Sequence, residues 1–560
     1  MLVTLVCAAV LGAKPPPDAR QDLLDAMVIE LDRNFKTLKL KENAPPYFLA
    51  YSMKDFEQRE ISARYGAIYQ DDTYRDRKLY VDARVGDYTF DSSIDDEIDF
   101  TFSLKGNSFI PRKNAPLDEH PLALRTSLWL VSDQQYKAAL FNFLKKKGED
   151  VYAVDDPKRP ASFTREEPVV YLGNRLPFSW SHDRWAALAR DVSGTFGAAP
   201  QLLDSEVRIA GDKVVRYLVN TEGTRIVTEE ALYAVHLSVW ARADDGQLLD
   251  DSRDWYAPTE EQLPTDAQVR EAAKKLVEEI SALRAAPSID PYTGPAILES
   301  DAAGVLFHEA VGHRLEGERQ GSDAEGKTFR GQVGKNVIAG FVSIYDDPTV
   351  REAAGKQLNG WYLYDDEGVK AQRVPLVEGG VLKNFLLSRK PIEGFSKSNG
   401  HGRAQSNHKP VARMANLIVE SKKQVDDKQL KAMLIAEAKR QGKPYGLIIK
   451  DITGGNTNTS SFGYQAFKGV PRMVYRVDVR DGRETLVRGV EIVGTPLSSI
   501  NKIMASGKTS GTFNGFCGAE SGMVPVSTVS PPMLLQEIEL QRVVEGKDRP
   551  PLLPPPGSAK

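Results

Sequence analysis

The spacing of apolar residues along the chain changes between two periods. Five stretches carry apolar residues three or four positions apart, which is the spacing of an amphipathic helix with one buried face. The predicted helices cover residues 21–41, 134–147 and 181–196, the stretch between Pro264 and Pro287, and residues 427–440. Residues 47–91 and 205–250 instead read as strand-like pieces separated by turn residues. We see no internal repeat, so the helices and strands form unequal blocks.

Glycines beside polar or glycine neighbours mark the predicted turns. In 205–250 they fall at Gly211-Asp212, Glu222-Gly223 and Asp245-Gly246, and they predict a β-meander. In the second half, Gly379-Gly380 and Asp481-Gly482 each separate two apolar arms and predict hairpins.

A chain of 560 residues is too long for one hydrophobic core. Segment 287–295 holds three prolines and a glycine, the composition of a domain boundary. We therefore predict an N-terminal α/β domain over 20–286, a strand-rich C-terminal domain over 287–545 and a proline-rich tail over 546–560. The fold class is α+β, with largely antiparallel sheets.

The N-terminus has the pattern of a secretory leader. Residues 2–13 are apolar and end in small residues before the sequence KPPPDAR. We predict a leader over 1–19 and export to the periplasm or the medium; the alternative is a frayed helix on a cytoplasmic protein. No apolar run reaches the ~18 residues of a membrane-spanning helix, so we predict no stable membrane span.

Composition narrows the function only by exclusion. The formal net charge is −4, so the chain lacks the positive excess typical of nucleic-acid binding. Without the leader and its Cys7, Cys517 is the only cysteine of the sequence. A single cysteine cannot form an internal disulfide, which leaves an inert core thiol, a nucleophile or a metal ligand.

The segment FHEAVGHRLEGE, residues 307–318, concentrates metal-binding chemistry. It differs from the zinc-protease helix H-E-x-x-H because His308 and His313 are five positions apart, about 140° around a regular helix. The two imidazoles can share one ion only if the helix bulges or ends between them. Gly312 is the residue that tolerates such a departure. The structural alternative is a buried His–Glu pair without a metal.

Zinc in a catalytic site takes three protein ligands from His, Cys and carboxylates and leaves one position for water. Residues that could supply the third ligand are Glu316, Glu318, His401, His408 and Cys517. Glu309 directly follows the first histidine, where H-E-x-x-H enzymes place the carboxylate that accepts a proton from water. The polar, glycine-rich segment 451–467 is either a loop near the cleft or a surface connection.

HEAVGHRLEGE, with its H-E-x-x-x-H core, resembles the signature of the TldD/PmbA family of bacterial and archaeal metallopeptidases. Further segments resemble other blocks of the family: RYLVNTEGTRIVTE, PYTGPAILESDAAGVLFHE, ARMANLIVE, LVRGVEIVGTPLSSI and FCGAESGMVPVST. The likeness covers residues 200–545, and residues 20–200 are compatible with it.

The resemblance implies a two-domain TldD/PmbA-like fold with a metal-binding helix at the start of the C-terminal domain. It implies a zinc-dependent peptidase of the active-subunit type that cleaves unfolded or extended peptides. The metal ligands would be His308, His313 and Cys517, and Glu309 would be the catalytic base. Family members form dimers, so the partner would be a second copy or a paralogous subunit. Most of the family is cytoplasmic, in contrast to the export predicted from the leader.

Two other functions fit the same residues. A cysteine hydrolase would use Cys517 as the nucleophile and His308 or His313 as its base. A non-catalytic peptide-binding or assembly subunit would keep the metal as a structural element.

Overall fold

A computed structural model describes residues 18–94, 111–150, 159–321, 328–457, 467–494 and 500–543. Residues 1–17 of the predicted leader and the whole predicted tail lie outside these ranges. The first half of the chain forms one six-stranded sheet in the order β2-β1-β4-β5-β3, with β6 also paired to β5. The strands are β1 (Pro46–Arg64), β2 (Ala67–Val85), β3 (Val170–Leu172), β4 (Leu202–Asn220), β5 (Arg225–Arg242) and β6 (Leu248–Ala257). Only the short β3 pairs in parallel.

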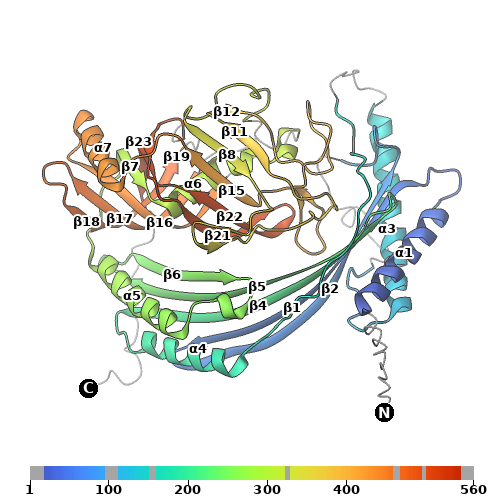
Figure 1. Ribbon diagram of the computed structural model, residues 1–560, viewed down its shortest axis with the longest axis horizontal. Coiled ribbons are helices and arrows are strands. Elements are labelled where there is room, and N and C mark those ends of the chain that lie inside the picture. Colours follow the sequence, from blue (N-terminus) through green and yellow to red (C-terminus); the bar gives the residue numbers. More distant parts are fainter. Residues whose placement is uncertain are drawn as a thin grey trace, which may run out of the picture.

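The two faces of this sheet differ in polarity, and helices cover the apolar face. Odd-numbered apolar residues point to one face, where α1 (Ala19–Thr37) and α3 (Pro121–Asp150) cover one end, and α4 (His182–Gly197) and α5 (Asp266–Ala285) cover the other. Even-numbered polar residues, such as Lys54 and Arg216, point to the opposite face, because side chains alternate along a strand. Figure 1 shows this long, curved sheet below the second half of the chain.

One predicted turn is wrong. Gly211-Asp212 lies in the middle of β4, which pairs on both sides without interruption at that point. Gly211 is opposite Tyr233 on β5, and a Cβ atom there would lie 2.9 Å from the tyrosine ring. Glycine is therefore used for close packing rather than for a turn. The turns at Glu222-Gly223 and Asp245-Gly246 are confirmed, since they join β4 to β5 and β5 to β6.

The second half contains two sheets. A six-stranded sheet has the order β12-β11-β8-β15-β22-β21, and a seven-stranded sheet has the order β16-β7-β23-β19-β17-β18, with β20 on β23. The first is built from β8 (Val342–Asp346), β11 (Val374–Glu378), β12 (Val381–Leu382), β15 (Asn416–Ser421), β21 (Gly511–Ala519) and β22 (Gly522–Ser530). The second is built from β7 (Tyr292–Leu298), β16 (Tyr445–Thr457), β17 (Phe467–Asp478), β18 (Glu484–Val487), β19 (Val490–Gly494), β20 (Ile503–Ser506) and β23 (Met533–Arg542).

Helix α6 (Ser300–Ala310) packs against strands of both sheets, and its apolar residues belong to the largest core of the molecule. Helix α7 (Asp427–Arg440) has the predicted bounds, with Asp426 capping its first turn. The hairpins predicted at Gly379-Gly380 and Asp481-Gly482 are confirmed as β11–β12 and β17–β18. Two small pairs complete the half: β9 (Glu352–Ala353) with β10 (Lys356–Gln357), and β13 (Gly402–Arg403) with β14 (Val411–Ala412).

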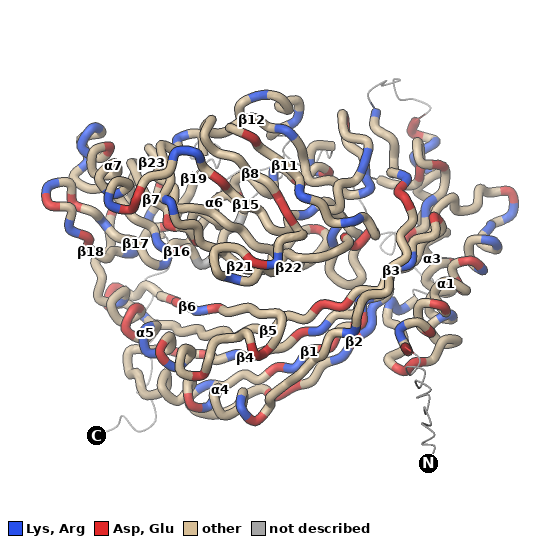
Figure 2. Tube along the Cα trace, in the orientation of Figure 1, with Lys and Arg blue, Asp and Glu red and all other residues tan. Residues whose placement is uncertain are grey.

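The fold is therefore mixed α+β with mostly antiparallel sheets, as predicted. Strand β7 begins at Tyr292, inside the proline-rich segment 287–295, and pairs only with strands of the second half. The domain limits at 286 and 287 stay a prediction. Acidic and basic residues are interspersed along both halves (Figure 2). In the described ranges, every helix is too short or too polar to cross a bilayer.

Candidate metal centre

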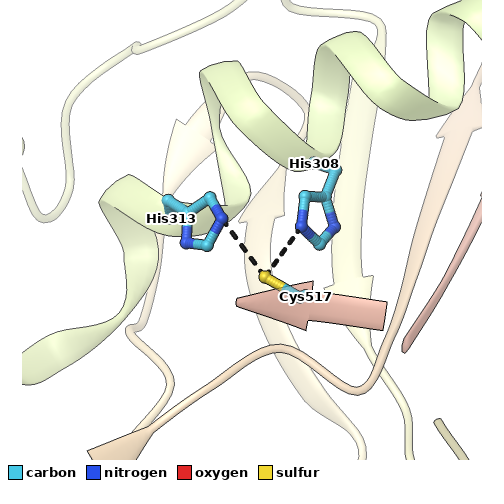
Figure 3. Close-up of side chains that lie close together, drawn as sticks. All are labelled: His308, His313 and Cys517. Carbon is cyan, nitrogen blue, oxygen red and sulfur yellow. Dashed lines mark hydrogen bonds between the residues drawn. The ribbon is translucent and has the colours of Figure 1, made fainter. Parts of the chain in front are cut away.

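Three side chains from two distant parts of the chain converge inside the second half. His308 lies near the end of α6, His313 lies in the 3-10 helix η2 (Gly312–Leu315), and Cys517 lies on β21. The sulfur of Cys517 is 3.2 Å from Nε2 of His308 and 3.3 Å from Nε2 of His313 (Figure 3). One donor atom from each residue lies within 4.8 Å of the others, and all three residues are buried.

The extra residue in H-E-x-x-x-H is accommodated by the end of the helix. Helix α6 stops at Ala310, Val311 is both its C-terminal cap and the residue before η2, and η2 begins at Gly312. The Arg314 guanidinium donates hydrogen bonds to the carbonyls of Glu309 and Ala310, which satisfies backbone acceptors at the helix end. Of the two arrangements the spacing allowed, the structure has the interrupted helix and not a bulge.

Gly312 is glycine for a reason other than backbone freedom. It is absent from the residues with positive φ. A Cβ atom on Gly312 would lie 2.0 Å from the sulfur of Met414, so this position requires close approach. The sequence therefore pointed to the right residue, but the cause is packing against a residue far along the chain.

Cys517 is placed by a hairpin at the edge of its sheet. Strand β21 pairs with β22 alone, with Cys517 opposite Val524. Alternation along β21 turns the Cys517 thiol toward α6 and leaves the neighbouring Phe516 side chain 45% exposed.

Buried polar groups hold the ligand-bearing segments in register. Oε2 of Glu316 lies 3.1 Å from Nδ1 of His313 and accepts a 2.7 Å hydrogen bond from Arg319. The fully buried Arg413 donates to the carbonyl of Cys517 at 2.7 Å, and its Nε lies 3.4 Å from Glu316. A carboxylate on the second nitrogen of a histidine fixes the tautomer that leaves Nε2 free to bind a metal.

The electrostatics of the cluster favour a thiolate. Burial alone would raise the pKa of Cys517, but His308 and His313 outweigh it and lower that pKa to about 4. Burial would lower the pKa of His313, but Glu316 and Cys517 raise it to about 10. The carboxyl of Glu316 is buried, yet His313 and Arg319 hold its pKa well below the usual range. A thiolate is the form of cysteine that binds metals.

Glu309 stands beside the cluster with its carboxylate unengaged. Among the described residues, no group forms a hydrogen bond or ion pair with that carboxylate, although Thr457 donates to the Glu309 backbone carbonyl at 3.1 Å. Gly455 of β16 leaves room for the side chain, because a Cβ there would lie 2.4 Å from Cγ of Glu309. Glu309, His308, His313 and Cys517 line a cavity of about 500 Å³.

The remaining candidates for a third ligand are engaged elsewhere. Glu316 supports His313, and Glu318 accepts hydrogen bonds from Ser388 and from the backbone of Ala412. His401 is fully buried against Asp346, and His408 is bonded to the carbonyl of Ser406. Among the described residues, only Cys517 joins the two motif histidines in such a group.

The cavity also has a wall that sequence reasoning missed. Asp254 and Tyr256 of β6 line it from the first half of the chain, and Gly454, Gly455 and Thr457 line it from β16. Segment 451–467 is therefore partly a strand beside the cleft, while residues 458–466 lie outside the described ranges. No sequence motif marks Asp254 or Tyr256. They line the cavity because both side chains lie on the side of β6 that faces it.

The donor set fits a zinc-like ion. Two imidazoles and a thiolate are nitrogen and sulfur ligands, whereas Mg²⁺ and Ca²⁺ prefer oxygen. A tetrahedral zinc ion with ordinary bond lengths separates its sulfur and nitrogen ligands by ~3.5 Å. The separations of 3.2 and 3.3 Å are close to that value.

Comparisons with known proteins show what this chain is similar to. Residues 291–542 match the family model described as the PmbA/TldA metallopeptidase C-terminal domain. This match and the relatives named as TldD homologs support membership of the TldD/PmbA family.

The chain aligns with about half the length of the curated relatives it matches. A metalloprotease of Archaeoglobus fulgidus is 31% identical over 48% of this chain and 57% of the relative. The zinc metalloprotease TldD homolog of Saccharolobus solfataricus is 26% identical over 44% of this chain and 51% of the relative.

Solved structures show the same fold over nearly the whole chain. The putative modulator of a DNA gyrase from Thermotoga maritima has a TM-score of 0.61 at 16% identity and covers 92% of this chain and 99% of its own. TldE of Thermococcus kodakarensis has a TM-score of 0.58 at 14% identity and covers 94% of this chain and all of its own.

Proposed function

We propose that this protein is a zinc-dependent peptidase that hydrolyses unfolded or extended peptides. The observation that carries the proposal is the convergence of His308, His313 and Cys517 on one buried point beside the unengaged carboxylate of Glu309. The relatives named as metalloproteases, one of them a zinc metalloprotease, support the same reaction class.

His308, His313 and Cys517 would hold the ion through Nε2, Nε2 and the thiolate. A bound zinc ion would supply a Lewis acid that polarises the scissile carbonyl and eases the deprotonation of water. Glu316 contacts His313, and Arg413 contacts both Glu316 and the carbonyl of Cys517. Together they would keep the segment that carries His313 aligned with the strand that carries Cys517.

Glu309 would act as the general base. Its carboxylate lines the cavity and forms no hydrogen bond or ion pair with a described residue. It could therefore accept a proton from the attacking water and pass it to the leaving amine. Thr457 and Arg314 fix the Glu309 backbone, which limits the positions the carboxylate can reach.

The shape of the cavity favours an extended substrate. Strand β21 forms one side of the cavity and, among the described strands, pairs with β22 alone, so a peptide could add to its outer edge through backbone hydrogen bonds. Such pairing recognises an extended chain more than a particular sequence, which suits unfolded peptides.

Glu309→Gln is the decisive variant. It preserves the size and most of the polarity of the side chain while removing its basicity, so we expect it to retain zinc and to lose about 10²–10⁴-fold in turnover of a disordered protein. His308→Ala should lose the metal as well. The matched control is Glu278→Gln on the exposed side of α5, which should change neither metal content nor turnover. Full zinc retention by His308→Ala would refute the ligand assignment.

A cysteine hydrolase is the second candidate, and one observation favours it. Cys517, His313 and Glu316 form a chain of contacts at 3.3 and 3.1 Å, the order of a nucleophile, a base and an orienting carboxylate. Chelation separates the two mechanisms. Removing the metal should abolish peptide hydrolysis if the protein is a metallopeptidase, and should leave hydrolysis unchanged if it is a cysteine hydrolase.

A non-catalytic binding or assembly subunit is distinguished by Glu309→Gln. That substitution would leave the function of such a subunit unchanged.

We further propose a dimer, formed by two copies or with a paralogous subunit. The solved TldE structure with the same fold is consistent with a paralogue as partner. Light scattering of the purified chain, alone and mixed with a co-encoded paralogue, tests this. Export also remains a proposal, and sequencing the mature N-terminus of the native protein tests it.

A further inference from the structure

The wall of the cavity opposite the metal cluster comes from the first half of the chain. Asp254 and Tyr256 lie two residues apart on β6, so both side chains point to the same side of the strand. They face β21 across the gap between the two halves, where β6 and β21 lie near each other in Figure 1.

The polar groups on this wall are incompletely engaged. Asp254 accepts a hydrogen bond from His236 at 2.7 Å through Oδ1, and its side chain is 41% exposed. Its Oδ2 and the Tyr256 hydroxyl have no hydrogen-bond partner among the described residues. Burial and Asp254 raise the pKa of Tyr256, so the hydroxyl stays a proton donor.

An aromatic surface lies next to these groups. The Tyr256 ring meets the Phe516 ring edge to face, with centroids 6.3 Å apart. Phe516 is 45% exposed although it adjoins a metal-ligand candidate, Cys517. Ring faces of this kind attract the aliphatic stems and the charges of lysine and arginine.

The charge of the lining favours a cation. Among the described residues that line the cavity, Asp254, Glu309 and Glu520 are acidic, and Arg319 is the single Lys or Arg. Arg319 is bonded to Glu316 and Glu520. The neighbouring Arg208 and Arg472 are likewise paired, with Glu60 and Asp451. Among the described bases, His236 contacts Asp254 directly, and Arg472 forms its ion pair with Asp451 but lies close enough for Asp254 to help raise its pKa.

We propose that Asp254, Tyr256 and Phe516 form a subsite for a positively charged group of the peptide. This rests on the proposed peptidase function and adds a substrate class to it. The carboxylate pairs with the charge, and the two rings pack along the stem. The charge could be a lysine or arginine side chain or the peptide's α-amino group, and both have the same chemistry.

The test measures binding separately from cleavage. The binding affinity of zinc-loaded Glu309→Gln protein is measured with labelled peptides whose other residues are uncharged. Each peptide carries one lysine or one glutamine, placed at each position in turn, and its N-terminus is free or acetylated. We expect about a tenfold preference for lysine at one position. Adding Asp254→Asn should reduce that preference to within about twofold. Asp244→Asn, an exposed carboxylate at the β5–β6 turn, is the control and should keep it.

Each outcome decides the proposal. A preference that depends on a free N-terminus and on Asp254 assigns the subsite to the α-amino group. A preference that survives Asp254→Asn, or that Asp244→Asn removes equally, overturns the subsite, as does the absence of any preference. If lysine peptides bind selectively through Asp254 but wild-type protein cleaves none of them, the subsite stands and the peptidase proposal fails.

Discussion

Glu316 shows how a single side chain can organise the cluster without joining it. It was a candidate ligand in the sequence, but its carboxylate points to Nδ1 of His313 and is held by Arg319. Glu316 thus orients the His313 imidazole. Such a role is invisible in the spacing of the motif, because Glu316 lies on a separate short turn after the helix has ended.

We predict that Glu316→Gln weakens zinc binding by about 10–100-fold, because an amide orients the imidazole less strongly than a carboxylate. Competition with a chromogenic chelator gives the affinity. Glu520→Gln is the matched control, since it removes the other carboxylate partner of Arg319 without touching His313. Equal affinities for wild type and Glu316→Gln would show that the contact does not support a metal ligand.

At the scale of elements, the junction between α6 and η2 brings the two histidines together. The rings of His308 and His313 lie 5.0 Å apart and nearly perpendicular, which a continuous helix would not allow at this spacing. Gly312 permits the junction because the Met414 side chain occupies the space where a Cβ would be.

We predict that Gly312→Ala destabilises the fold by about 1–3 kcal/mol and lowers zinc affinity, since the clash with Met414 must displace η2. Truncating the opposing side chain in Gly312→Ala/Met414→Ala should restore part of the zinc affinity. Gly321→Ala serves as the control, because its nearest contact to a new Cβ is an ordinary 3.6 Å. Thermal unfolding and metal affinity are measured for all four proteins. Failure of the double variant to recover any zinc affinity would contradict the packing explanation.

At the scale of the whole molecule, buried charges join the two halves. Lys54 of β1 donates to the carbonyl of Ala404 and pairs with Asp366, both at 2.6 Å. Arg389 pairs with Glu222 of the first half, and its backbone amide donates to Glu367 at 2.7 Å. These contacts tie the sheet of the first half to the second half.

Glu367 makes this junction sensitive to pH. Burial, together with the neighbouring carboxyl of Asp365, raises the pKa of Glu367 well above its usual range, while Arg389 opposes the shift. The folded protein therefore holds a proton that the unfolded chain releases near pH 4. The stability linked to this proton is complete below that pH and is lost as the pH rises toward the folded pKa.

We predict that Glu367→Gln flattens the decline of stability as the pH rises above about pH 5, where one proton corresponds to ~1.4 kcal/mol per pH unit. The amide keeps an acceptor for the Arg389 backbone and removes the titrating group. Melting temperatures across this range provide the measurement, with the exposed Glu378→Gln as control. Parallel curves for wild type and Glu367→Gln would rule out the proposed linkage.

Elements specified by neighbouring residues could be predicted from the sequence. Apolar spacing located α7 to the residue and α5 closely, and Asp-Gly and Gly-Gly pairs located the hairpins. The motif around His308 and its resemblance to a known family could also be recognised from the sequence, because the residues of a motif are neighbours in the chain. Helix α3 shows the limit, since it begins at Pro121, well before the periodic stretch that predicted it.

Contacts between distant residues could not be predicted in this way, because they depend on how the whole chain packs. Cys517 is 209 residues from His308, and spacing cannot encode that contact. The residues Gly211 and Gly312 were noticed as turn or hinge positions, yet each is glycine because a side chain from another segment presses on it. Asp254 and Tyr256 enter the cavity because the polar face of the first sheet lies against the second half. Local periodicity specifies which face of an element is buried, whereas the packing of whole sheets specifies what that face meets.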